Sequence, residues 1–554
     1  MVIKIFLLLI VAGGVSALFH GEKLSKFLSL VLAALGLVLL VNLYQNWQLG
    51  VTDNFTYDWI YSHYYPVKIN LYSTPAYYAL IFPFFVIAVI SMLFNSFFRQ
   101  EQNSLRVNGL VSLNLAALIL LICSENSIQL LVSACVIDIF GFYLINDSIA
   151  RRKYIFYNLI ADMGLFMLFA LIWGYINSIQ LADFGKYAKL GAHKDFVCIL
   201  LLLCLFIKSG LFMFQTPVID WKALDINRIS LLSYLSTPVV GFLILYKTEM
   251  LLPLSGYSLP LLHFFAAASI IWGFFGTLVM DELRQKAIYF NMMLYGLLYG
   301  LFSAGFAVET PLFASLMVCG FLLNSCWLMV IVGSSNETYV SAMGGFIKGL
   351  KLTFAVTLIV IGAYFQVLMQ VEKSYPYWGC GFICVLAVGV SYLLHQIYFG
   401  QSHADERVLA LLKNPLFIYG TTVLAAASAV LWDNRPIGVE AGIVFMAFLL
   451  LVWVAPLRFI CRLYENEYIQ NIAWFSDFYR LFVIGPTKIL GRVLWLTIDF
   501  LIIERTIINS LHKMVGLLIN IFRKLHADSR WAYPLFLLAG IGLAFGSYYL
   551  AAGK

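Results

Sequence analysis

Lys208 is the residue of this sequence that is best placed to do chemistry, because it stands inside a long apolar stretch. It lies in the run Ile199–Phe214, with apolar neighbours for about two helical turns on each side. A charged side chain at the centre of a membrane helix costs ~2.5–3.5 kcal/mol on insertion scales, so it needs a partner or a function. Loss of water favours the neutral amine, whereas a nearby carboxylate favours the ammonium. An amine balanced between these influences can relay protons; a permanently paired or snorkelling lysine is the structural alternative.

Two carboxylates occupy comparable apolar surroundings and are candidate partners of this lysine. Asp138 lies in the middle of the run 128–146, and Asp162 lies early in the run 154–178. An opposite charge within ~4–6 Å favours the ammonium form of Lys208, so movement of the partner would control its proton. For each acid alone, a structural ion pair explains its position as well as a proton site does.

Two histidines and two prolines mark the apolar runs around and after the lysine. His263 and His395 lie in later runs, and a lone histidine in an apolar helix is more often a core residue than a relay, so both are secondary candidates. Pro217 and Pro238 interrupt helical runs near Lys208. Since membrane helices break where the backbone lines a cavity or site, we expect a functional break here.

The segments that carry these residues are long and apolar enough to be membrane helices. Of the 554 residues, 62% are hydrophobic and 11% are charged, against ~25% charged residues in a soluble domain. Lipid accepts such a chain only when backbone polar groups are satisfied within helices or closed barrels, and the continuous runs favour helices. We therefore predict an all-α integral membrane protein with broken helices and about sixteen transmembrane spans. The predicted spans are 2–19, 27–45, 75–98, 108–123, 128–146, 154–178, 196–215, 229–248, 259–280, 288–307, 311–333, 345–371, 376–398, 415–431, 437–456 and 531–551.

Composition also limits the classes of site. The net charge of +7 is scattered, which suits basic cytoplasmic loops and does not indicate nucleic-acid binding. The nine cysteines fit free thiols, and neither a disulfide framework, a metal site nor a cofactor motif is predicted. The connector 46–74 is rich in tyrosine and tryptophan, as at a membrane interface. Residues 1–19 fit a first membrane helix, with a signal peptide as the alternative.

The tail differs from the rest of the chain. From Pro486 to about Asp528, charged residues alternate with aliphatic ones, which predicts an amphipathic helix roughly 60 Å long that lies along the membrane or along other helices. The final span, 531–551, would anchor its far end; several short cytoplasmic helices are the alternative. The predicted parts are N-terminal helices (1–107), a transmembrane core (108–456), a linker with the lateral helix (457–528) and an anchor (529–554).

Several spaced motifs resemble one family. Lys208-Ser209-Gly210, followed by Asp220, Gly241 and Lys247, resembles without a gap the broken-helix region of the antiporter-like subunits of respiratory complex I and Mrp-type cation/proton antiporters. The resemblance implies that Lys208 is the proton relay of a first half-channel. Further matches are Asn158, Asp162, Gly164, the loop Asp281–Arg284, Tyr289, Met292, Met343-Gly344-Gly345 and Lys348. The tail residues Phe478-Tyr479, Phe482, Pro486, Asp499 and Glu504 are similar to the distal, L-type subunit, whose lateral helix ends in an anchor.

The sequence departs from that family at titratable positions of the first half-channel. The family's glutamate in its fifth helix falls near Cys135 or Val136, two or three residues before Asp138. The histidine that follows the family's broken helix is Ser233 here. The first half-channel is therefore expected to be partly intact.

The second half-channel is more depleted. Cys319 and Leu323 replace a histidine and a lysine of the family's eleventh span. The nearest candidate for the Lys or Glu at the break of the twelfth helix is Lys373, shifted by about one turn. By the resemblance, Lys247 and Lys373 are secondary relay candidates beside the two histidines.

The resemblance implies a divergent proton-translocating subunit of a complex I-like NADH:quinone oxidoreductase or a related ion-coupled complex. The chain would have no redox site of its own, which leaves open whether it counts as an enzyme subunit. The alternatives are a non-conducting structural subunit and a proton-coupled membrane partner of an inorganic-carbon transporter. Expected partners are the lipid bilayer and other membrane subunits contacted by the lateral helix. The expected location is the bacterial inner membrane.

Overall fold

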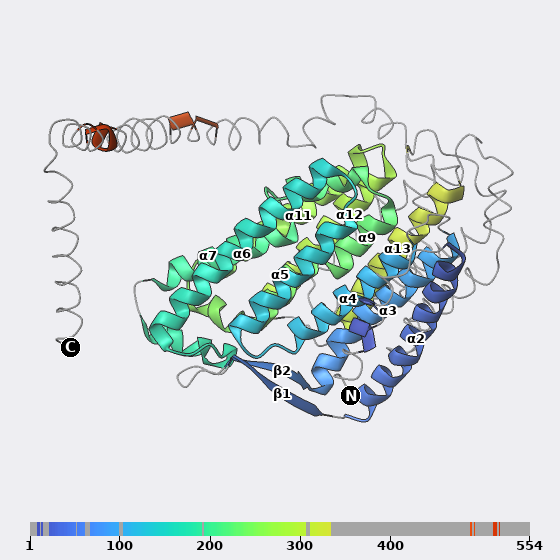
Figure 1. Cartoon of the computed structure of the whole chain (residues 1–554), viewed down its shortest axis with the longest axis horizontal. Helices are drawn as coiled ribbons and strands as arrows, with labels where there is room; N and C mark the ends of the chain where they lie inside the picture. The colour runs from blue at the N-terminus through green and yellow to red at the C-terminus, as the bar shows by residue number, and fades with distance from the viewer. Residues whose placement is uncertain are drawn as a thin grey trace, which may run out of the picture. The chain divides into compact units, whose positions relative to one another are not determined.

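Long helices make up most of the part of the chain that the structure describes. The structure, a computed structural model, describes residues 8–11, 13–14, 22–50, 52–60, 67–98, 104–190, 193–305, 311–333, 339, 488–489, 492–493, 513–517 and 520. The chain divides into two compact units, Met1–Ala473 and Trp474–Lys554. In the first unit, the described helices run side by side as a bundle (Figure 1). Five of them are long and apolar enough to cross a membrane.

The helix positions follow the apolar runs of the sequence closely. The runs predicted at 75–98 and 311–333 are α3 and α13, and the other described helices begin or end within a few residues of their runs. Helices adjacent in the sequence pack as pairs, with α2 on α3, α4 on α5, α6 on α7 and α11 on α12. The long helices are α2 (Glu22–Gln48), α3 (Pro75–Phe98), α4 (Ser104–Ile122), α5 (Ser127–Leu144), α6 (Ser148–Ile176), α7 (Lys194–Ser209), α9 (Ile226–Leu235), α10 (Thr237–Lys247), α11 (Ser258–Val279), α12 (Leu283–Ser303) and α13 (Pro311–Gly333). Short helical segments are η1 (Leu181–Leu190), α8 (Thr216–Ile219), η2 (Asp220–Ala223) and η3 (Glu249–Leu254).

A β-hairpin interrupts the helical pattern between α2 and α3. Its strands, β1 (Asp53–Ile60) and β2 (Val67–Ser73), pair antiparallel at one end of the bundle (Figure 1). The prediction of an all-α chain missed this hairpin, although β1 alternates aromatic with polar residues, the period-two pattern of a strand. The Asn126 side chain at the start of α5 donates to Lys68 O at 2.7 Å, which ties the hairpin to the bundle.

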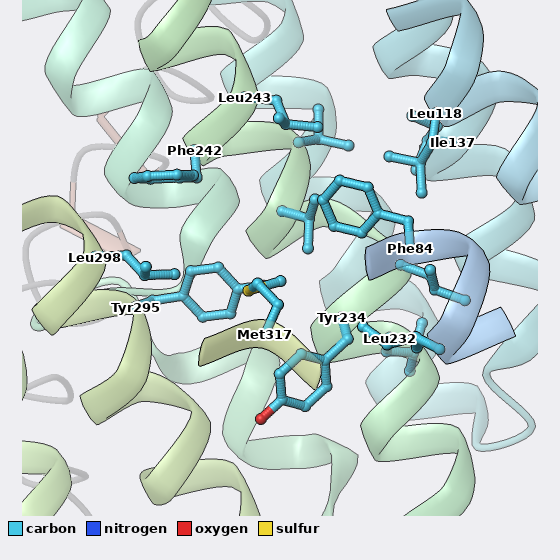
Figure 2. Close-up of a cluster of buried hydrophobic side chains, with 14 of the residues drawn as sticks. Phe84, Leu118, Ile137, Leu232, Tyr234, Phe242, Leu243, Tyr295, Leu298 and Met317 are labelled. Carbon is cyan, nitrogen blue, oxygen red and sulfur yellow. The ribbon is translucent and has the colours of Figure 1, made fainter. Parts of the chain in front are cut away.

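The interior of the bundle is apolar and tightly packed. The segment that carries α9 and α10 is almost entirely buried, as expected of a helix that is apolar on all sides and lies among other helices. In Figure 2, side chains from several helices, among them Phe84, Ile137, Phe242 and Met317, interdigitate in one cluster. By contrast, α6 exposes a large apolar face, which suits contact with lipid or with a partner protein. Exposed residues of this face include Ile149, Phe156, Leu159, Met163 and Phe166.

Several predicted elements lie outside the described residues. These are the spans at 345–371, 376–398, 415–431, 437–456 and 531–551, and most of the span at 2–19. Of the predicted lateral helix, only residues 488–489, 492–493, 513–517 and 520 are described, and these are helical. The total of about sixteen spans and the lateral helix therefore remain predictions.

Candidate functional site

Lys208 lies between the two carboxylates that the sequence proposed as alternative partners. Its Nζ is 2.7 Å from Asp138 Oδ2 and 2.7 Å from Asp162 Oδ1. The contact with Asp138 has hydrogen-bond geometry, and the contact with Asp162 is an ion pair. Side-chain exposure is 0% for Lys208, 3% for Asp138 and 13% for Asp162, so water has little access to any of them. The structure thus brings both carboxylates into contact with the same Lys208 ammonium.

The charges of this triad do not balance when all three groups are ionised, because one ammonium then faces two carboxylates. A buried net charge is costly, so the triad has an electrostatic reason to bind one additional proton. Asp138 Oδ1 is buried and has no hydrogen-bond partner among the described residues, and Cys135 Sγ lies 3.6 Å from Asp162 Oδ2. The Asp138 carboxylate therefore has a buried oxygen that is open to a proton, next to the Lys208 ammonium.

Caps at both ends of α5 fix the position of Asp138. The Asn126 side chain accepts a hydrogen bond from the backbone of the first turn, as an N-cap does. At the other end, the guanidinium groups of Arg228 and Arg151 donate to the last carbonyls, at 3.1 Å and at 2.6–2.8 Å respectively. Cationic donors suit the negative end of a helix dipole. Asp138 therefore stands on a helix held at both ends.

Lys208 lies in the last turn of α7. The helix ends at Gly210, whose φ of 60° is left-handed and favours glycine. Gly241 on α10 allows that helix to approach, because a Cβ there would lie 3.1 Å from Leu205 O and 3.3 Å from Lys208 Cβ. The predicted run to residue 215 was therefore too long, and α7 ends immediately after the lysine.

The helix break predicted near Pro238 lies at Ser236, between α9 and α10. Proline has no N–H to donate to the preceding turn, and the end of α9 at the break leaves its last carbonyl groups without partners within the helix. Side chains from other helices satisfy two of them: Asn114 Nδ2 donates to Leu235 O at 2.7 Å, and the Tyr295 hydroxyl donates to Ser233 O at 2.6 Å. A break stabilised in this way can persist within a packed membrane bundle.

The break also lies against the helix that carries Asp138. The Tyr154 hydroxyl, on α6, lies 2.9 Å from Ser236 Oγ. Both groups fit against α5 at Gly141, one turn after Asp138, where a Cβ would collide with them. The triad and the broken helix are therefore neighbours in one packed region. Pro217, the other predicted breaker, lies in the first turn of α8.

The secondary candidates that are described do not join the triad. Lys247 Nζ lies 4.0 Å from the centre of the Tyr77 ring, a cation–π contact. His263 is half-buried, and its Nδ1 is 2.8 Å from Leu259 O of its own helix. Lys373 and His395 lie outside the described residues. Within the described ranges, no group of three or more His, Cys, Asp or Glu side chains is placed to hold a metal ion.

A neutral hydrogen-bond network surrounds Ser233, which stands where the resemblance places the histidine after the broken helix. Ser233 Oγ accepts from Asn291 Nδ2 at 2.9 Å, and Asn291 Oδ1 accepts from Tyr234 at 2.8 Å and from Asn324 Nδ2 at 2.9 Å. Figure 2 shows the Tyr234 hydroxyl directed away from the apolar cluster. The nearby substitutions Cys319 and Leu323 are buried, each 2% exposed.

Sequence reasoning missed Lys286, a second fully buried lysine. It is 0% exposed, and its Nζ donates to Thr277 O in the last turn of α11 at 2.8 Å. The apolar run was predicted to begin at residue 288, so Lys286 was assigned to a loop. The structure has α12 beginning at Leu283, which places the lysine within the helix. Five consecutive positions without a turn residue before the run could have indicated the earlier start.

Solved structures of membrane complexes have this fold. One chain in the structure of the Mrp complex from Dietzia sp. DQ12-45-1b matches with a TM-score of 0.64 and 16% identity, over 98% of this chain and 63% of that one. This chain therefore spans less than two thirds of that Mrp chain. No protein-family model and no curated protein matches the sequence.

Two respiratory complexes match similarly. A chain of the membrane-bound sulfane sulfur reductase (MBS), an archaeal respiratory membrane complex, gives a TM-score of 0.63 at 13% identity, covering 98% of this chain and 99% of that one. The chain therefore has a fold that is found in chains of these membrane complexes. A chain of respiratory complex I from Thermus thermophilus with bound NADH gives a TM-score of 0.61 at 15% identity, over 78% of this chain and 100% of that one. The predicted resemblance to subunits of respiratory complex I and Mrp-type antiporters is thus confirmed at the level of the fold, at low sequence identity.

Proposed function

We propose that this chain is a proton-translocating, antiporter-like membrane subunit of a multisubunit complex. The observation that carries the proposal is the buried Lys208 ammonium, which lies 2.7 Å from carboxylates on two different helices. The fold supports it, because the structural neighbours are chains of membrane complexes. A complex I-like NADH:quinone oxidoreductase of a bacterial inner membrane is the assembly proposed, with the tail as lateral helix and anchor.

The proposed mechanism is a proton relay through the triad. When a partner subunit displaces α5 or α6, one carboxylate separates from Lys208 and its charge loses compensation. That acid takes up a proton. When the helix returns, Lys208 passes its ammonium proton onward along the path, and the acid reprotonates the resulting neutral amine, which restores the carboxylate–ammonium pair. Conformational energy from the rest of the complex is thereby converted into proton movement.

A non-conducting structural subunit is the second candidate function. The neutral network of Ser233, Asn291 and Asn324 favours it, since amide side chains do not carry protons onward as titratable groups do. In this alternative, the triad is a permanent ion pair that holds α5, α6 and α7 together. The two functions predict different consequences for replacement of the triad.

The deciding experiment is proton transport by the full assembly in proteoliposomes, read with a pH-sensitive dye. The variants are Lys208→Ala and Asp138→Asn, with Lys186→Ala as control because that lysine is exposed and, among the described residues, forms its ion pair with Asp183 on η1. We expect both triad variants to reduce transport strongly and the control to match the unmodified protein. Unchanged transport in both triad variants, in an assembly that remains intact, would refute the proton relay.

A further inference from the structure

A polar stripe runs along the buried face of α12. Asn291, Tyr295 and Tyr299 follow one another at intervals of four residues and are 2%, 2% and 0% exposed. Side chains spaced in this way share one helix face. Asn291 and Tyr295 contact α9 close to the helix break, whereas Tyr299 contacts the end of α7, the helix that carries Lys208. The stripe therefore contacts both the break between α9 and α10 and the end of α7.

The contact of Tyr299 with Ser209 has a defined donor. The two hydroxyl oxygens lie 2.5 Å apart, and Ser209 Oγ also lies 3.3 Å from Pro238 O. A carbonyl oxygen only accepts, so Ser209 donates its single proton to Pro238 O, and Tyr299 donates to Ser209. The result is a directed chain from α12 through α7 to α10, just beyond the break.

Aromatic contacts that do not involve the hydroxyl group hold the Tyr299 ring in place. Its centre lies 6.1 Å from that of Phe206 and 5.5 Å from that of Phe242, both as edge-to-face pairs. Removal of the hydroxyl alone therefore leaves the ring packed and affects only the hydrogen-bond chain. Ser209 is the last residue of α7 and follows Lys208 directly, so the chain acts on the turn that holds the ammonium.

We infer that Tyr299 is a positioning residue for Lys208. Its hydroxyl, through Ser209, holds the last turn of α7 against α10 and thereby sets the distance from the Lys208 ammonium to both carboxylates. The inference rests on the proposed function, because it gives Tyr299 a role in positioning the proposed proton relay.

The titratable groups around Lys208 define what a measurement would report. They are Asp138 and Cys135 on α5, Asp162 and Tyr154 on α6, Cys204 on α7 itself, and Tyr299 on α12. Of these, only the two aspartates give an infrared carboxyl band. The pH midpoint of that band therefore reads the triad independently of transport.

The test compares Tyr299→Phe with Tyr295→Phe in the full assembly. Both variants remove one hydroxyl from a buried ring on the same face of α12, but Tyr295 bonds Ser233 O rather than α7. We expect Tyr299→Phe to move the midpoint of the Asp138 carboxyl band by about one pH unit and to slow transport roughly tenfold. Tyr295→Phe should leave the midpoint unchanged.

Ser209→Ala supplies the second arm of the test. If Tyr299 acts through Ser209, Ser209→Ala shifts the midpoint as Tyr299→Phe does, and the double variant shifts it no further. Equal shifts in Tyr299→Phe and Tyr295→Phe, or an additive double variant, would overturn the inference. If the unmodified assembly moves no protons, the proposed function fails, while the midpoint comparison still decides the positioning role.

Discussion

Replacement of both Asp138 and Asp162 by Asn should destabilise the protein far more than the two single replacements together. In either single variant, Lys208 keeps one carboxylate at 2.7 Å, and the remaining pair is neutral overall. The double variant leaves a 0% exposed ammonium without a counter-charge. Removal of the partners of a buried charge costs ~3–5 kcal/mol, which is a large fraction of the stability of a typical protein.

The measurement is thermal or denaturant unfolding of the single and double variants in lipid nanodiscs. We expect each single variant to lose at most ~1 kcal/mol, because one Lys–Asp pair remains and the excess negative charge is removed, with a clearly non-additive double variant. Additive and small losses would mean that the two acids do not share the lysine.

Asp183→Asn is the matched control, because Asp183 pairs with the exposed Lys186 on η1. Hydrogen bonds from Lys186 and Ser178 hold the pKa of Asp183 below its usual value. A lowered carboxyl pKa contributes stability above the ordinary pKa, and this contribution is lost as the pH falls through the lowered value. Because the pair is exposed, Asp183→Asn should lower the stability only slightly at neutral pH, and this small effect should disappear in acid.

Replacement of Lys208 by Arg should abolish proton transport while it preserves the ion pairs. Arginine keeps a positive charge between the two carboxylates but does not release its proton in proteins. A relay that requires the neutral amine therefore stops, whereas a structural ion pair survives. We expect transport in Lys208→Arg to fall by at least ~100-fold, the effect of losing an essential proton carrier.

The assay is dye-detected proton uptake by proteoliposomes that contain the complete assembly, with unfolding measured on the same samples. Arginine is larger than lysine, so a loss of stability would confuse the result. Lys208→Met keeps an unbranched side chain of similar length without the charge, so it separates the effect of charge from the effect of volume. Transport retained in Lys208→Arg would mean that the group works as a fixed charge and that the proton path bypasses it.

The agreement of sequence and structure is best where one periodic signal decides the answer. The long apolar runs placed α3 and α13 correctly, and the missing N–H of Pro238 predicted the break at Ser236. The clash between a charge and its apolar surroundings identified Lys208 and both acids. Burial and charge are local properties, so a single sequence carries them.

Other features depend on packing that a single sequence does not carry. The choice between Asp138 and Asp162 could not be made, because the relative rotation of α5 and α6 decides whether both reach Lys208. The contact of Tyr299 with Ser209 joins residues ninety positions apart and has no local signature. Two features were open to prediction and were missed: the β-hairpin, with its alternating pattern in β1, and the early start of α12 that buries Lys286.

The central claim is that the triad changes its protonation during turnover, and infrared difference spectroscopy tests it most directly. Spectra of the full assembly in membranes would be recorded before and after an imposed proton gradient, with Asp138→Asn for assignment. We expect a carboxyl band that changes with the gradient and is altered in Asp138→Asn. A carboxyl region that stays constant under a gradient that drives transport would contradict it.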